Sequence, residues 1–149
     1  MPWTAYTTVA AIIESAGRFL LVEEKSDTGA VVINQPAGHL NEGESLLDAV
    51  VRETREETAW RFHPRGLVGV YRWQVSPGGK TYIRFCFFGD GDDHRPEQPL
   101  DPEILGTKWM TRDELAGGTS QLRSPMVLIC INDYLSGCRH SLELLRDLG

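Results

Sequence analysis

The chain has 149 residues, of which 41% are hydrophobic and 24% charged, and both values are ordinary for a globular protein. At this length we expect a single domain spanning residues 1–149, large enough to bury a core without disulfides or a structural metal. The net charge of −6 argues against a broad surface for binding a nucleic-acid polymer. An acidic enzyme that acts on a phosphate ester would therefore need a metal ion or local cations.

The cysteines and the hydropathy pattern exclude several other classes of protein. Cys86, Cys130 and Cys138 are odd in number and lack CxxC spacing, which predicts reduced, buried thiols rather than a disulfide framework or a zinc site. The first residues lack a basic segment followed by an apolar one, and no apolar run approaches the ~20 residues of a membrane span. We therefore expect a cytoplasmic protein that does not bind membranes.

The first third of the chain predicts short strands. Residues 7–13 are rich in β-branched and small apolar side chains, and residues 18–23 follow a Ser-Ala-Gly segment, which predicts a hairpin. Residues 31–33 predict a further short strand. The Gln-Pro-Ala-Gly segment at residues 35–38 predicts a loop, because proline and glycine interrupt regular structure.

A helix is predicted from Ser45, where the hydrophobic period changes. Ser45 and Asp48 resemble a capping box with Asp in place of the usual Glu. The stripe of residues at helical spacing is Leu47, Val50, Val51 and Thr54.

The second half of the chain predicts another hairpin, a long loop, a strand and helices. Residues 68–75 and 81–88 flank a Ser-Pro-Gly-Gly turn, which predicts the hairpin. The polar segment 90–102 predicts a loop, residues 104–110 a strand, Thr111 to Glu114 a helix cap, and residues 124–135 a closing helix. Strands interleaved with two or three helices predict an α/β or α+β sandwich.

Three glutamates crowd one edge of the predicted helix. Glu53, Glu56 and Glu57 fall within an arc of roughly 100°. Like charges at these spacings disfavour a helix, and acids near its C-terminus oppose the helix dipole. Bound divalent cations would reverse this penalty, and oxygen-only ligands favour magnesium or manganese over zinc. The alternative is a solvated acidic face, partly neutralised by contacts of Arg52 with Glu56 and of Arg55 with Glu53.

The loop before the helix makes the acidic pattern specific. Gly38, Glu44, Arg52, Glu53, Glu56 and Glu57 stand at the spacing G-x5-E-x7-R-E-x2-E-E. At ~7% usage for each residue type, chance would produce these matches at roughly 10⁻⁷ per starting point. In this pattern the chain resembles the Nudix hydrolase family.

Two positions depart from the family pattern. Thr54 stands where a bulky aliphatic residue is usual, and Ala59 stands where a glycine normally ends the helix. Alanine in the positive-φ conformation of such a glycine costs on the order of 1 kcal/mol. We therefore expect the helix to run longer or to end differently. Neither departure removes a carboxylate.

The resemblance implies a Nudix-type α/β/α sandwich with a mixed β-sheet, and it implies roles for the matched residues. The metal ligands for Mg²⁺, or Mn²⁺, would be Glu53, Glu56, Glu57 and the carbonyl oxygen of Gly38, with Arg52 holding the glutamates and Glu44 bracing the loop. The cations would neutralise a diphosphate while water attacks phosphorus. The general base would be Glu53 or Glu103, with Asp101 as the substitute for Glu103.

Outside this pattern the chain resembles a subgroup, the NudJ-like phosphatases. The resemblance rests on residues 21–24, 34–40, 84–85 and 122–125. It implies hydrolysis of nucleoside di- and triphosphates and of thiamine-related pyrophosphates, including the hydroxymethylpyrimidine precursor, with release of orthophosphate. The partner would be a small phosphorylated substrate, and the protein would be a monomer or a homodimer.

Substrate contacts are predicted on the second hairpin. Arg84 would lie opposite Trp73 if the turn is centred on residues 77–79, and it would grip a phosphate bidentately or form a surface ion pair. Trp73 or Tyr71 would stack on a pyrimidine or nucleobase, or else belong to the core. The competing function is a non-catalytic Nudix-fold nucleotide sensor, which the presence of all the pattern's glutamates disfavours.

Overall fold

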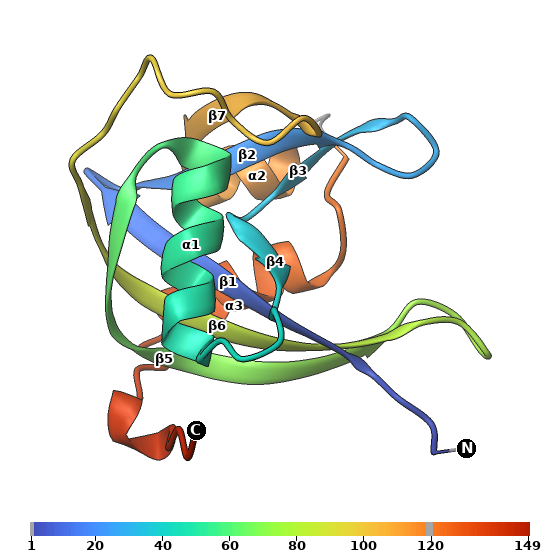
Figure 1. Ribbon diagram of the computed structural model, residues 1–149. Helices are drawn as coiled ribbons and strands as arrows, with labels where there is room; N and C mark the ends of the chain where they lie inside the picture. The colour runs from blue at the N-terminus through green and yellow to red at the C-terminus, as the bar shows by residue number, and fades with distance from the viewer. Residues whose placement is uncertain (1, 119–120) are drawn as a thin grey trace.

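The computed structural model describes residues 2–118 and 121–149 (Figure 1). The strands are β1 (Tyr6–Ser15), β2 (Arg18–Lys25), β3 (Val31–Asn34), β4 (Ala37–His39), β5 (Arg61–Gln74), β6 (Thr81–Asp92) and β7 (Ile104–Met110). The helices are α1 (Leu46–Thr58), α2 (Arg112–Gly117), α3 (Met126–Leu135) and the 3₁₀ helix η1 (Leu142–Leu144). Among the described residues, no helix combines the length and the hydrophobicity needed to cross a membrane.

Strand β1 organises the mixed sheet. The strand order is β3-β2-β1-β6-β5, with β4 paired to β1 and β7 paired to β2. β1 runs parallel to β6 and antiparallel to β2 and β4. Its pairing with β2 is confined to the residues beside the hairpin turn, while its other half pairs with β4. β1 and β2 therefore diverge, and the cavity described below lies where they do.

Alternating side chains of β1 produce the layers. Val9 and Ala11 pack in a cluster with Val50 of α1, whereas Ala10 packs in a second cluster with Val127 of α3. Figure 1 shows α1 in front of the sheet and α2 and α3 behind it. The α/β/α sandwich with a mixed sheet is thus confirmed.

Helix α1 starts where the sequence predicts. The Ser45 side chain accepts a hydrogen bond from the backbone N–H of Asp48 at 3.1 Å, which stabilises the first turn. The predicted inward stripe is confirmed at Val50 and Thr54, which are buried. Leu47 is partly buried and packs against the core, whereas Val51 is partly buried without being part of either core cluster. The buried residues of α1 are Ala49, Val50, Thr54, Glu57 and Thr58. The inward face is therefore rotated toward Glu57.

Helix α1 ends at Thr58, as it would with the glycine of the family pattern. Ala59 adopts the left-handed conformation with φ 62°, and its N–H donates to the carbonyl oxygen of Arg55. The expectation of a longer or different helix end is therefore wrong. The Arg55 side chain donates to the carbonyl oxygen of Ala59 at 2.9 Å, which helps to hold this strained residue in place.

Three predicted boundaries are corrected by pairing between strands. Residues 37–39 form β4, because Gly38 pairs with Val9 of β1, so the loop predicted at 35–38 is shorter. β5 begins at Arg61 rather than residue 68, and β6 runs to Asp92. Bulges near Gly66 and Gly69 interrupt the alternation of β5, which hides the first half of this strand from pattern analysis.

The cysteines are free, as predicted. Cys86 and Cys130 are buried, whereas Cys138 is only partly buried. Burial raises the pKa of the Cys86 thiol well above its ordinary value, which keeps the thiol protonated.

The turn between β1 and β2 stores avoidable strain. Ser15 pairs with Arg18, and both residues between them have positive φ, 51° at Ala16 and 77° at Gly17. Two positive-φ residues are typical of a type I′ turn, which favours Asn-Gly. Ala16 is exposed, so its methyl group contributes little packing.

We predict that Ala16→Asn raises the free energy of unfolding by about 0.5–1 kcal/mol in urea titrations. Ala59→Gly is the matched comparison, because it relieves a similar φ but removes a methyl group that is buried, worth about 0.8 kcal/mol. The gain in the free energy of unfolding should therefore be smaller for Ala59→Gly than for Ala16→Asn. An unchanged midpoint for Ala16→Asn would contradict the assignment of strain to this turn.

Candidate active site

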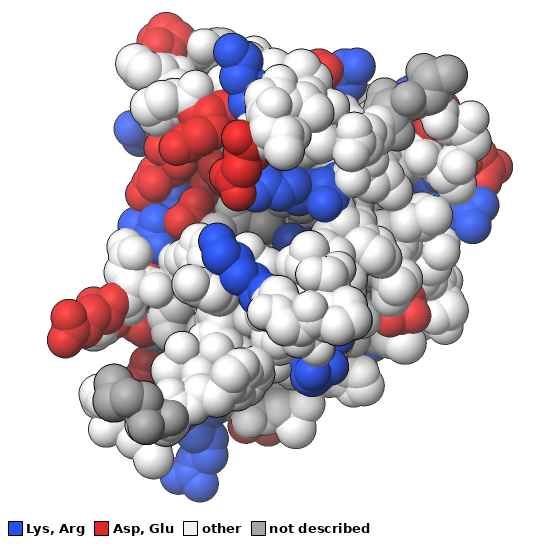
Figure 2. Space-filling model, turned by 90° about the vertical axis from the view of Figure 1, so that its right-hand side faces the viewer, with Lys and Arg blue, Asp and Glu red and all other residues white. Residues whose placement is uncertain are grey.

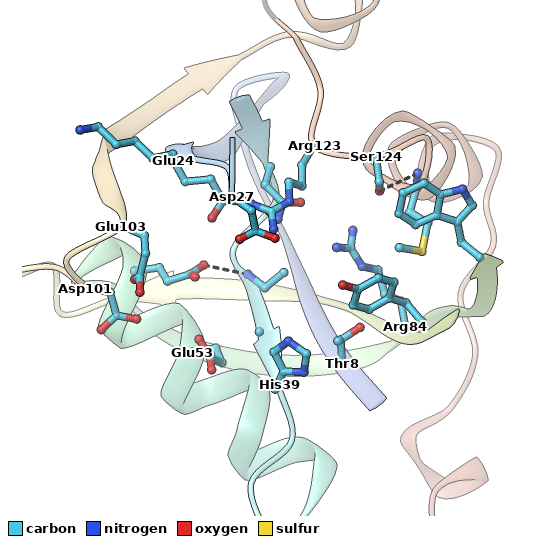
Figure 3. Close-up of a pocket in the computed structure, with 18 of the residues that line it drawn as sticks. Thr8, Glu24, Asp27, His39, Glu53, Arg84, Asp101, Glu103, Arg123 and Ser124 are labelled. Atoms are coloured by element: carbon cyan, nitrogen blue, oxygen red, sulfur yellow. Dashed lines mark hydrogen bonds and ion pairs between the residues drawn. The ribbon is translucent and has the colours of Figure 1, made fainter. Parts of the chain in front are cut away.

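A cavity of about 560 Å³ opens where β1 and β2 diverge (Figure 3). Its walls come from strands β1 to β4, helix α1, the segment before β7, the β5–β6 hairpin and the start of α3. Figure 3 places Glu53, Asp101 and Glu103 on one side and Arg84 and Ser124 on the other. Acidic side chains also gather on one side of a hollow in the surface, with basic side chains across from them (Figure 2).

The acidic side contains a group of three carboxylates that could hold a cation. Glu53, Glu56 and Asp101 each offer an oxygen, and these oxygens lie within 4.8 Å of one another. The N–H of Asp101 donates to the carbonyl oxygen of Glu56 at 3.0 Å, which fastens this loop to the end of α1. The structure therefore brings Asp101 into the group. Glu103 lines the same cavity with an exposed side chain.

Arg52 ties the carboxylates of α1 to the loop that precedes it. Its Nε and Nη2 donate to the two carboxylate oxygens of Glu44 at 2.7 and 2.9 Å, a bidentate ion pair. Its Nη1 donates to Glu53 at 2.9 Å and to Glu56 at 3.2 Å. These contacts raise the pKa of Arg52, so the guanidinium stays charged. Arg55 points elsewhere and pairs with Asp93, so the contact considered between Arg55 and Glu53 is absent.

Burial and the repulsion of nearby carboxylates raise the pKa values of Glu53 and Asp101. The pKa of Glu53 is raised chiefly by desolvation, against the opposing effect of Arg52. Desolvation and the nearby charges of Glu56 and Glu103 raise the pKa of Asp101. A divalent cation would relieve both effects, because it replaces lost solvation and screens the repulsion.

Glu57 lies deeper than the other glutamates. Its Oε1 accepts a hydrogen bond from the N–H of Ala37 on β4 at 2.9 Å. Desolvation raises the pKa of Glu57 to about 9, and the charges of Glu53, Glu24 and Asp101 add to this effect. Glu57 lines the cavity but lies outside the three-carboxylate group. One of its oxygens is thus engaged by the backbone.

Gly38 occupies a position that requires the absence of a side chain. A Cβ built on Gly38 would overlap the carboxylate of Glu53. Its φ is not in the left-handed region, so close approach rather than conformation explains the glycine. Because β4 passes this close to α1, the Glu53 carboxylate is held at the wall of the cavity.

The opposite side of the cavity contains Arg84, which is 5% exposed. Its Nη1 donates to Oε1 of Gln35 at 2.8 Å, and its buried Nε has no hydrogen-bond partner among the described residues. Trp73 lines the same wall and stacks against Tyr82, with ring centroids 6.1 Å apart and planes at 22°.

The predicted pairing of Arg84 with Trp73 is wrong. Arg84 lies opposite Tyr71, and Trp73 lies opposite Tyr82, because the turn is closed by Val75 and Lys80. This register differs from the expected one by two residues, which keeps Arg84 and Trp73 on one face of the hairpin. Tyr71 instead donates to Asp133 at 2.8 Å and packs against the core.

Sequence reasoning missed a polar group on the wall formed by β2 and β3. Glu24 is 8% exposed and accepts a hydrogen bond from Asn34 at 3.0 Å. It also forms an ion pair with Arg123 at 3.4 Å. All three residues lie within segments that carried the family resemblance. Their separate positions in the chain gave no sign that they meet.

The site suits a divalent cation on physical grounds. The atoms that could coordinate a cation are all oxygens, the carboxylates are crowded and partly desolvated, and Gly38 leaves room for Glu53. The residues that could hold the cation are Glu53, Glu56 and Asp101, with Glu57 adjacent along α1.

Comparisons with known proteins agree with this geometry. Residues 4–127 match the NUDIX domain. Phosphatase NudJ of Escherichia coli K12 is 37% identical over 144 residues, which span 97% of this chain and 92% of that protein. A NUDIX hydrolase from Nitrosomonas europaea superimposes with a TM-score of 0.93 at 41% identity, covering 97% of both chains.

A more distant structure supports the fold alone. The Escherichia coli ORF135 protein superimposes with a TM-score of 0.72 at 22% identity, covering 89% of this chain and 90% of that one. Nudix hydrolases cleave pyrophosphate bonds in small phosphorylated compounds and generally use divalent metals. The chain belongs to the NUDIX family and is a Nudix hydrolase.

Proposed function

We propose that this hydrolase cleaves a phosphoanhydride bond in nucleoside di- or triphosphates or in thiamine-related pyrophosphates, with magnesium as cofactor and release of phosphate. The observation that carries the proposal is the group of Glu53, Glu56 and Asp101, whose carboxylates could hold a cation at one side of a substrate-sized cavity. The similarity to a protein named phosphatase supports phosphate as the product. The three free cysteines fit a cytoplasmic location, which is reducing.

The roles of the residues follow from their contacts. Magnesium held by the carboxylate oxygens of Glu53, Glu56 and Asp101 would neutralise the diphosphate and stabilise the charge on the leaving oxygen. Arg52 holds Glu53 and Glu56 in place, while Glu44 holds Arg52. Glu53 and Glu103 both line the cavity, and one of them accepts the proton of the attacking water.

The proposed activity is tested by phosphate release with and without Mg²⁺. The substrates are hydroxymethylpyrimidine diphosphate, thiamine diphosphate and a set of nucleoside di- and triphosphates. We expect magnesium-dependent release of orthophosphate from at least one of them. Tight binding without release from any of these compounds would instead support the nucleotide sensor.

We propose Glu57 as a further ligand of the cation and predict that Glu57→Gln lowers the rate of phosphate release by about a hundredfold or more. The amide oxygen can still accept the hydrogen bond from Ala37, so the fold should be retained. Glu143→Gln, on the exposed 3₁₀ helix, is the matched control and should leave the rate unchanged. Full activity of Glu57→Gln would exclude Glu57 from the reaction.

We predict that Gly38→Ala also lowers the rate, because the added methyl group displaces the Glu53 carboxylate. The Mg²⁺ concentration needed for half-maximal rate should rise by about tenfold, since displaced ligands bind the cation less well. Gly106→Ala is the control, because a Cβ there meets no atom within 4 Å. An unchanged magnesium requirement in Gly38→Ala would show that the Glu53 position does not matter.

A further inference from the structure

Arg84 is a buried cation that its surroundings leave unneutralised. The side chain is 5% exposed, and among the described residues its hydrogen-bond partner is the neutral amide of Gln35. Its Nε has no partner. A buried charge without a counter-ion, and a buried donor without an acceptor, are both costly. Such a group at a cavity wall is therefore suited to a ligand that brings acceptors with it.

Gln35 determines which donors of Arg84 remain available. Gln35 is 1% exposed, its Nε2 donates to the sulfur of Cys86 at 3.4 Å, and its Oε1 accepts from Nη1 of Arg84. With Nη1 engaged, the edge of the guanidinium formed by Nε and Nη2 has no partner among the described residues. Nε and Nη2 are parallel donors that match two adjacent acceptors on a ligand, and because Nε is buried, such a ligand must displace the atoms that cover it.

An aromatic platform lies beside this edge. Tyr82 precedes Arg84 by two residues on β6, so both side chains are on one face of the strand. Trp73 stacks on Tyr82 and lines the cavity with it. Met126 contributes a further apolar side chain to the lining. A flat heteroaromatic ring packed here would turn one edge toward Arg84.

The two sides of the cavity have different electrostatics. The three carboxylates that could hold a cation belong to the side formed by α1 and the segment before β7, whereas Arg84 lies across the cavity (Figure 3). A substrate whose diphosphate lies on the acidic side can extend its attached ring across the cavity toward Arg84 and the platform. In that orientation the ring edge, rather than a phosphate, would meet the guanidinium.

We propose that Arg84 is a specificity-determining residue that selects a nucleobase with two adjacent hydrogen-bond acceptors, as cytosine and guanine have. This inference rests on the proposed function and narrows its substrates. Cytosine offers N3 and O2, and guanine offers O6 and N7. Uracil has an N–H in place of the N3 acceptor, and adenine has an amino group in place of O6. The aminopyrimidine ring of thiamine-related compounds also lacks the acceptor pair.

Binding of nucleoside monophosphates tests the proposal separately from hydrolysis, because these ligands lack an anhydride bond. In titration calorimetry with Mg²⁺, CMP should bind about tenfold more tightly than UMP, and GMP should bind about tenfold more tightly than AMP. These two ratios of dissociation constants measure the base selectivity. In Arg84→Lys the charge stays but the two-donor edge is lost, so both ratios should fall to about one. Arg123→Lys is the matched control in the same cavity and should keep both ratios.

A ligand without a base, together with a thermal melt, distinguishes loss of base selectivity from loss of a phosphate contact or of the fold. Methylenediphosphonate, which has no base, should bind wild type and Arg84→Lys equally. If Arg84→Lys bound all ligands more weakly by the same factor, including methylenediphosphonate, the result would overturn the proposal and indicate that Arg84 contacts a phosphate. Equal binding of CMP and UMP by a wild-type protein that is folded in thermal melts would also overturn it. Retained CMP selectivity without hydrolysis of any nucleoside di- or triphosphate or thiamine-related pyrophosphate would contradict the proposed function while supporting the role of Arg84.

Discussion

Mutual repulsion among carboxylates is the main physical constraint on the acidic side of the cavity. Glu53, Glu56 and Asp101 are held close together although like charges in a partly desolvated site oppose one another. Arg52 offsets part of this repulsion, and its bidentate pair with Glu44 prevents the guanidinium from moving away. The remaining charge is what makes the site attractive to a divalent cation. The arrangement thus costs some local stability, which a bound cation would restore.

Elements on both sides of the acidic group hold its carboxylates in place. β4 approaches α1 closely, which is possible because Gly38 has no side chain, and the adjacent N–H of Ala37 binds Glu57. The divergence of β1 from β2 opens the cavity next to the carboxylates, and the β5–β6 hairpin closes its far side with Arg84. The substrate would therefore lie between a wall suited to cations and a wall that supplies hydrogen-bond donors and aromatic faces.

The features that sequence analysis predicted correctly are those with local causes. The helix start at Ser45 and the two hairpins follow from periodicity and turn residues within a few positions. β4 could not be predicted, because a three-residue strand exists only through its pairing with β1. The hairpin register at Arg84 depended on how the Ser-Pro-Gly-Gly turn closes, and the presence of Asp101 in the acidic group depends on a backbone hydrogen bond to Glu56. Such contacts join distant segments and leave no periodic pattern.

The carboxylates at the edge of α1 are proposed to bind a divalent cation. Electron paramagnetic resonance of Mn²⁺ titrated into the protein tests this proposal without any substrate. We expect wild type to bind Mn²⁺, and Glu56→Gln, which alters the most exposed glutamate contacted by Arg52, to bind it about ten- to a hundredfold more weakly. Equal Mn²⁺ affinity in both proteins, or none in wild type, would mean that the acidic edge is a solvated surface and would contradict the account.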